Sequence, residues 1–252
     1  MENQISKESA SNAVDLLIEE ALTHRAVCHP YLKAMADNQL PNMHWALCDF
    51  AQHYYGYSEA FPRYLTATIS RLDNPRHRSL LLENLTEESG QYTDKDLCKL
   101  QEFNIEREWI EGIPHPALFD RFRRAMGVII QNEEALEVIC WRESFLSLLT
   151  SGTAEEALGA IGLATESTVK AIYSQLYIAV KNCRAINPRD FVFFPLHVLV
   201  DDDHQASLRQ VAIEYAMKPE GLTSLRKGML KALWLRDSFW SWMLQRALKN
   251  ST

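Results

Sequence analysis

Two imidazoles and a carboxylate recur at helical spacing near residue 200 of this 252-residue chain. His197, Asp201 and His204 stand at i, i+4 and i+7, so on one continuous helix their side chains lie within about 60° of one another. Neutral imidazole and carboxylate are the ligands of non-haem iron sites that keep coordination positions open. The flanking residues are apolar, so we expect the stripe to face inward, where ionisable groups are costly unless paired or metal-bound. The spacing indicates either a metal site or a satisfied buried hydrogen-bond network.

Other residues could extend such a site to two metals. A dinuclear centre in a helical bundle draws further carboxylates, and usually another histidine, from other helices. Glu166 is an isolated acid in a segment that is otherwise apolar or small, and His115 lies between two prolines. Glu87 and Glu88 end another segment, and at most one of them faces a given site because neighbours point about 100° apart. Each residue also has an ordinary interpretation, as a charge on a solvated helix face or as a turn residue.

Composition narrows the functional classes. The net charge of −7 and the lack of a Lys/Arg block argue against a nucleic-acid surface. Residues 1–11 are polar, are expected to be flexible and lack the apolar core of a signal peptide. No stretch approaches the roughly 20 apolar residues that span a bilayer. The five cysteines are widely spaced without a CxxC pair, which argues against disulfides or a cysteine zinc site. We expect a cytoplasmic protein that binds neither nucleic acid nor membrane.

Helical signals dominate the chain. No window alternates apolar and polar residues as a half-buried strand does, and turn residues such as Asn74-Pro75 separate the periodic segments. The expected helices cover residues 12–36, 43–72, 76–90, 93–104, 117–126, 132–149, 153–181, 189–217 and 219–248. There is no internal repeat or linker. We therefore predict an all-α protein, residues 1–252 forming one domain built as a bundle of about seven principal helices.

Several of these segments come in an order that resembles a known family. Residues 82–90 (LENLTEESG), then 115–122 (HPALFDRF), then Glu166, then His197-x3-Asp201-x2-His204 resemble the haem-oxygenase-like diiron oxidase superfamily. This superfamily is related in fold to the thiaminase TenA and the pyrroloquinoline-quinone synthase, and it includes a Chlamydia protein that associates with death domains. Residues 29–32 and 42–61 resemble its first helices, so the resemblance covers nearly the whole chain. It implies a haem-oxygenase-like helical domain and a homodimer.

The resemblance also implies a set of metal ligands. Carried over by position, one iron is held by Glu88, His115 and His204, and the other by Glu166, His197 and Asp201, with Glu166 near or bridging both. Glu88 is preferred over Glu87 because the family ligand stands two residues before the glycine.

The segment between Glu88 and His115 is longer than in the Chlamydia protein and resembles that of relatives that oxidise amino acids, guanidines or fatty acids. Some of those relatives add a carboxylate from this segment, so Glu108 or Glu111 is a candidate extra ligand.

The chain departs from one branch of the family at two positions. The branch that makes p-aminobenzoate from its own tyrosine has a lysine on the Glu166 helix and a tyrosine one turn before the first histidine of the stripe. Here Leu176 and Phe193 occupy those positions, and Lys170 is on the wrong turn. Self-sacrificing p-aminobenzoate synthesis is therefore the less favoured alternative.

The resemblance implies an enzyme, an O2-activating non-haem diiron oxidase or oxygenase. Its cofactor would be two iron ions, its co-substrate O2, and its substrate a small amino acid, amine or carboxylic acid, with an external electron donor as a further partner. Tyr54, Tyr57, Phe61 and Phe193-Phe194 are expected to line the pocket, and the two tyrosines to be oxidisable neighbours of the metals. A metal-free TenA-like hydrolase or binding protein is the other alternative.

Overall fold

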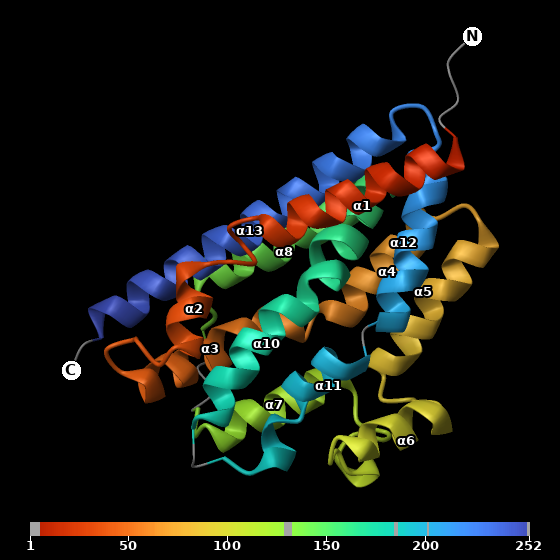
Figure 1. The fold of residues 1–252 in the computed structure, drawn as a ribbon. Helices are drawn as coiled ribbons and strands as arrows, with labels where there is room; N and C mark the ends of the chain where they lie inside the picture. Colours follow the sequence, from red (N-terminus) through yellow and green to blue (C-terminus); the bar gives the residue numbers. More distant parts are fainter. Residues whose placement is uncertain (1–5, 129–132, 184–185, 201, 251–252) are drawn as a thin grey trace.

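The computed structural model describes residues 6–128, 133–183, 186–200 and 202–250, with the side chains of residues 200 and 202–204 excepted. All regular elements in these ranges are helices, and they pack as an all-α bundle (Figure 1). In the first half they are α1 (Lys7–Thr23), α2 (Pro30–Ala36), α3 (Met43–Ser58), α4 (Phe61–Arg71), α5 (Pro75–Glu88), α6 (Asp94–Glu102), η1 (Arg107–Trp109) and α7 (His115–Ala125). In the second half they are α8 (Leu136–Ser151), α9 (Ala154–Leu158), η2 (Gly159–Glu166), α10 (Ser167–Lys181), η3 (Pro188–Phe191), α11 (Phe193–Val200), α12 (Asp202–Ala216) and α13 (Gly221–Lys249).

The first helix starts earlier than the sequence predicted. The hydroxyl oxygen of Ser6 accepts a hydrogen bond from the backbone N–H of Ser9, which caps the first turn of α1. Ala10 and Val14 are buried on the face that this turn presents to the bundle. Residues 7–11 therefore belong to α1, whereas the sequence predicted a helix from residue 12.

The bundle has more helices than the predicted seven because several long segments are divided. The segment 43–72 divides at the corner between α3 and α4, where Pro62 occupies the first turn of α4. The segment 153–181 passes through η2, a π-helix between α9 and α10. The segment 189–217 consists of η3, α11 and α12, and the last two run in different directions (Figure 1).

The division between α11 and α12 contradicts the prediction that His197, Asp201 and His204 form one stripe on a single helix. The three-residue stripe required one continuous helix from residue 197 to residue 204, but α11 ends at Val200 and α12 begins at Asp202. His197 belongs to α11 and His204 to α12, so they do not share one helix face. Asp201 and the side chain of His204 lie outside the described residues.

The long helix α13 packs directly against α9 and η2. A Cβ on Gly159 would lie 1.9 Å from the backbone oxygen of Leu225, and one on Gly228 would lie 1.9 Å from the backbone oxygen of Glu156. Glycine at both positions therefore lets the two backbones approach each other. Aromatic rings fill the adjoining core: Tyr54 stacks on Trp240 with centroids 5.5 Å apart.

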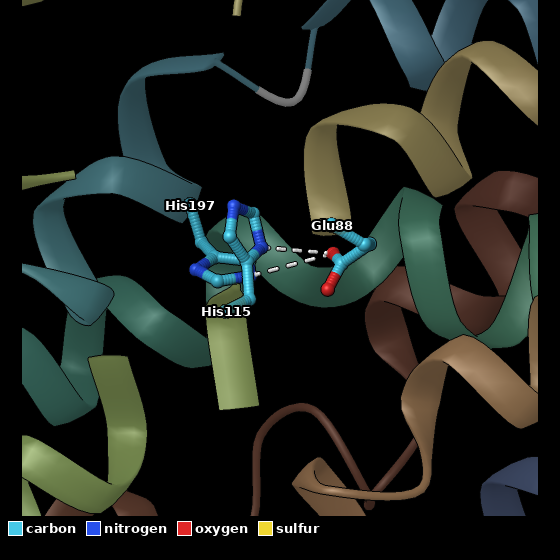
Figure 2. A group of neighbouring side chains, drawn as sticks. All are labelled: Glu88, His115 and His197. Carbon is cyan, nitrogen blue, oxygen red and sulfur yellow. Dashed lines mark ion pairs between the residues drawn. The ribbon is translucent and has the colours of Figure 1, made fainter. Parts of the chain in front are cut away.

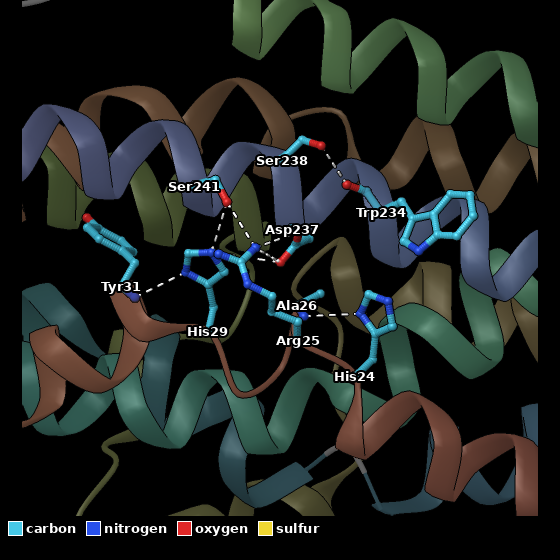
Figure 3. Close-up of polar contacts among 9 residues, drawn as sticks. All are labelled: His24, Arg25, Ala26, His29, Tyr31, Trp234, Asp237, Ser238 and Ser241. Atoms are coloured by element: carbon cyan, nitrogen blue, oxygen red, sulfur yellow. Dashed lines mark hydrogen bonds and ion pairs between the residues drawn. The ribbon is translucent and has the colours of Figure 1, made fainter.

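A buried histidine fastens α2 to α13 (Figure 3). The Nδ1 atom of His29 accepts the N–H of Tyr31 and so caps α2. Its Nε2 therefore carries the proton and donates to Ser241 Oγ, 3.1 Å away. Arg25 binds both carboxylate oxygens of Asp237 beside this pair.

Among the helices of the described ranges, none is long and apolar enough to cross a membrane.

Candidate metal centre

Three predicted ligands from three different helices meet in the interior (Figure 2). Glu88 is the last residue of α5, His115 the first residue of α7, and His197 lies in α11. Glu88 Oε1 is 3.0 Å from His115 Nδ1 and 3.9 Å from His197 Nε2. One ligand atom from each residue lies within 4.8 Å of the other two, and all three side chains are buried. The structure thus brings together three residues that are far apart in the sequence.

The chain after α5 brings Glu88 beside His115. Gly90 has φ of +85°, the left-handed conformation that commonly ends helices. Its carbonyl oxygen accepts the N–H of Gly112 at 2.8 Å, and a Cβ on Gly90 would lie 2.5 Å from the backbone N of Ile113. The end of α5 is thus held against the entry to α7, even though the segment between them contains α6 and η1.

Hydrogen bonds orient both imidazoles toward the carboxylate. Since a carbonyl oxygen only accepts, His197 Nδ1 donates to Phe193 O at 2.7 Å, and the lone pair is on Nε2, the atom that faces Glu88. His115 Nε2 is hydrogen-bonded to the hydroxyl of Tyr92 at 2.7 Å. Such partners at the outer nitrogen are typical of metal-binding histidines.

The contact between His115 and Glu88 fits a shared metal better than a hydrogen bond. The buried Nδ1 of His115 has no hydrogen-bond partner among the described residues, although Glu88 Oε1 lies only 3.0 Å away. The two atoms approach each other without hydrogen-bond geometry. Imidazole nitrogen and carboxylate oxygen are both suitable ligands for iron. A cation between them would satisfy an otherwise unpaired buried nitrogen.

Glu166 reaches the same interior space from η2. It is buried, and its Oε1 accepts a hydrogen bond from Asn84 Nδ2 at 3.2 Å. Glu166 lines one pocket together with Glu88 and His197. A π-helical turn is costly and frequently marks a functional position. Four of the six predicted ligands are therefore gathered around one space.

The carboxylates proposed as alternatives lie elsewhere. Glu87 is only half buried, whereas its neighbour Glu88 lies in the cluster. Glu108 and Glu111 are exposed, and both oxygens of Glu111 bind Arg107 at 2.6 Å. The expectation that one of these two residues adds a ligand is wrong, because Glu108 in η1 and Glu111 just after it both face solvent.

Aromatic side chains enclose the pocket beside these ligands. Its lining consists of Tyr54, Tyr57, Ser58, Phe61, Glu88, Thr165, Glu166, Val169, Tyr173, Phe193, His197 and Arg236. The predicted positions of Tyr54, Tyr57, Phe61 and Phe193 are confirmed. Phe194 was also predicted to line it but packs in the core against Phe122 instead. The free space is about 30 Å³, enough to hold a water molecule.

Sequence reasoning missed two polar residues of the pocket wall. Tyr173 shares a hydrogen bond with Tyr54, their hydroxyl oxygens 3.0 Å apart, and Arg236 donates to the Tyr57 hydroxyl at 3.1 Å. Burial raises the pKa of Tyr54 to about 12, and it also raises the pKa values of Tyr57 and Tyr173. All three phenols are therefore protonated at neutral pH. A charged residue inside the aromatic run 234–242 was the available signal for Arg236.

A second polar cluster contains the residue types of a hydrolase but not the geometry. Ser241, His29 and Asp237 lie together (Figure 3). In a catalytic triad the aspartate and the serine bind opposite nitrogens of the histidine. Here Ser241 Oγ and Asp237 Oδ1 both lie on the Nε2 side, at 3.1 and 3.8 Å, while Nδ1 caps a helix. This arrangement is structural and gives no support to a metal-free hydrolase.

Comparisons with known proteins identify relatives of this chain. A 4-aminobenzoate synthase of Chlamydia muridarum (strain MoPn / Nigg) is 25% identical over 209 residues, which cover 79% of this chain and 76% of that protein. A CADD-like protein of unknown function from Nostoc punctiforme PCC 73102 has a similar structure, with a TM-score of 0.72, 18% identity and coverage of 96% and 97% of the two chains.

A domain of unknown function with a heme oxygenase-like fold from Shewanella denitrificans OS217 matches with a TM-score of 0.65 and 14% identity, covering 98% of this chain and 97% of that one. These structural likenesses show a haem-oxygenase-like fold. The model of the family described as iron-containing redox enzyme matches residues 48–237, which is most of the chain. The protein therefore belongs to the family of iron-containing redox enzymes.

Proposed function

We propose that this protein is an O2-activating non-haem diiron oxidase that acts on a small organic molecule. Its two irons would be held by Glu88, His115, Glu166, His197, Asp201 and His204. The observation that carries the proposal is the convergence of Glu88, His115 and His197, with each imidazole oriented by a hydrogen bond on its outer nitrogen. Family membership supports iron as the metal.

The protein's contribution would be geometry and exclusion of water. Iron would supply the redox chemistry with O2, because protein side chains alone do not activate O2 readily. Phe193 O fixes the tautomer of His197, Tyr92 orients His115, and Asn84 holds Glu166. The aromatic walls would limit the entry of water, and Tyr54 and Tyr57 line the same pocket as Glu88, Glu166 and His197, as oxidisable neighbours.

The test of this proposal is anaerobic loading with Fe(II). We expect two iron ions per chain and a transient visible absorption band when O2 is admitted. His197→Ala should lose iron binding while circular dichroism still shows a folded bundle. The matched control is His44→Ala, since His44 is exposed on α3 and lies outside the cluster. A wild-type protein that takes up no iron under any condition would refute the proposal.

A second candidate is a self-sacrificing enzyme like the Chlamydia relative, which is named a 4-aminobenzoate synthase. Three tyrosines in the pocket wall, Tyr54, Tyr57 and Tyr173, favour it. Against it, Phe193 carries no hydroxyl and Leu176 is fully buried at the positions where that branch has tyrosine and lysine. Intact-protein mass spectrometry after exposure to Fe(II) and O2 distinguishes the two. An unchanged mass during turnover supports the oxidase, and loss of a tyrosine side chain supports the second candidate.

A further inference from the structure

One buried cation in the pocket wall has no acidic partner among the residues that the structure describes. Arg236, in the middle of α13, is 3% exposed. The hydroxyl of Tyr57 is the one hydrogen-bond acceptor that the described residues offer it, and none of their carboxylates forms an ion pair with it. Two other arginines are paired with carboxylates: Arg123, which is 7% exposed, binds Asp120 at 2.7 Å, and Arg246 binds Asp49 at 2.6 Å.

This arrangement is unfavourable for the protein by itself. A guanidinium group stays charged in proteins and presents five N–H donors, of which one is used here. Removing such a charge from water without a counter-ion is costly, and neutral phenols offset only part of that cost. A buried charge that lowers stability is typical of binding sites, where function is kept at the expense of stability.

The location of Arg236 indicates which kind of ligand its guanidinium could bind. Arg236 lines the same pocket as Glu88, Glu166 and His197, and the rest of the lining is largely aromatic. No ion pair joins Arg236 to Glu88 or Glu166 within the described part of the chain. An anionic group that entered this pocket would find a desolvated guanidinium, and its apolar part would contact the rings of Tyr54, Tyr57 and Tyr173.

We propose that Arg236 binds the carboxylate of the substrate, and that the substrate is a small carboxylic acid with an apolar body. This inference rests on the proposed function, because the bound acid is a substrate only if the protein is an oxidase. The binding of a carboxylate by Arg236 does not itself require iron. The planar fork of one guanidinium matches one carboxylate in two parallel hydrogen bonds. A phosphate group carries more charge and would lie in a pocket that also contains two acidic side chains, so we assign the site to a carboxylate.

The experiment measures binding of acetate and benzoate to the iron-free protein by calorimetry. Benzamide, which has the shape of benzoate without the charge, should bind more weakly than benzoate. Arg236→Gln should weaken the binding of both carboxylates by about tenfold to a hundredfold, the range for hydrogen bonds to charged groups. Arg123→Gln is the matched control, because it removes a buried arginine outside the pocket and should leave the affinities unchanged.

Stability separates a binding role from a structural one. If Arg236 serves the ligand, Arg236→Gln removes an unpaired buried charge, so its melting temperature should equal or exceed that of the wild type. Arg236→Lys keeps the charge but loses the fork, and it should bind carboxylates with intermediate affinity. A fall in melting temperature together with unchanged benzoate affinity would show that Arg236 is structural and would overturn the proposal.

Two further outcomes would also overturn it. One is the absence of Arg236-dependent binding for both acetate and benzoate. The other is inorganic phosphate binding more tightly than benzoate through Arg236. The iron experiment is separate: Arg236-dependent benzoate binding in a protein that never takes up iron would leave this inference intact and refute the oxidase. Iron uptake without carboxylate binding would support the oxidase and refute the inference about Arg236.

Discussion

The imidazole of His197 donates its Nδ1 proton to the carbonyl oxygen of Phe193, 2.7 Å away and one turn earlier in α11. This bond belongs to the helix itself, so the orientation of the ring is set before any metal binds. His115 is oriented differently, by the hydroxyl of Tyr92 from the segment after α5. One ligand therefore depends on the backbone of its own helix and the other on a side chain that can be changed.

Replacement of Tyr92 by phenylalanine should weaken metal binding without unfolding the protein. The change removes only the hydroxyl that holds His115 Nε2 at 2.7 Å. Loss of such a partner typically lowers metal affinity by about 10–100-fold. Competition for Fe(II) with a chromophoric chelator measures the effect. Tyr177→Phe, in α10 and outside the pocket, is the control, and equal iron affinities in the two variants would show that Tyr92 does not support His115.

Replacement of Phe61 by alanine should open the pocket. Phe61 is the half-buried residue of a lining that is otherwise buried, so it lies at the mouth, at the corner between α3 and α4. With about 30 Å³ of free space, ligands larger than water need this side chain to move. We expect faster benzoate association in stopped-flow measurements and a stability loss of about 1–2 kcal/mol. Phe103→Ala, at an exposed position, should change neither quantity.

The resemblance to a known family predicted the ligands at helix ends. It favoured Glu88 over Glu87 because the family ligand stands two residues before a glycine, here Gly90, and in the structure Glu88 lies beside His115. The continuous stripe failed because spacing alone assumed an unbroken helix. Three successive aspartates were a contrary signal, since aspartate is a poor residue inside a helix and a good one where a helix begins.

The partners of the ligands could not be predicted in the same way. Tyr92 approaches His115 because Gly90 and Gly112 hold two chain segments together, a contact between residues far apart in sequence. Arg236 points into the pocket because of how α13 is rotated against η2, and helical periodicity in an apolar helix does not determine that rotation. The contacts of Tyr92 and Arg236 depend on how the helices pack, which the sequence pattern does not determine.

The contact between η2 and α13 should tolerate no added methyl group. In Gly159→Ala the new Cβ would lie 1.9 Å from the backbone oxygen of Leu225, so the helices must move apart. We expect a loss of about 3 kcal/mol in the free energy of unfolding, measured by urea denaturation. Gly162→Ala is the matched control in the same π-helix, because its Cβ would meet the side chain of Leu208 at an ordinary 3.5 Å. Equal stabilities of the two variants would contradict the close approach.

Acidification should weaken the link between α2 and α13 through His29. Burial, with a further contribution from the positive charge of Arg25, lowers the pKa of His29 from 6.5 to about 4. Between these two pH values the unfolded chain binds a proton that the folded protein does not, so stability falls as the pH drops from about 6.5 to about 4. The loss from this residue is complete only below about pH 4, where the folded protein also binds the proton.

Comparison with His29→Asn isolates this contribution from the carboxylates that titrate in the same range. Asparagine can still cap α2 but does not titrate, so the variant is expected to be less stable than the wild type near pH 7 and to lose less stability between pH 6.5 and pH 4. Urea denaturation of both proteins at each pH gives the two slopes. Parallel slopes would mean that His29 takes up its proton equally well in the folded and unfolded states, which its position between Tyr31 and Ser241 should prevent.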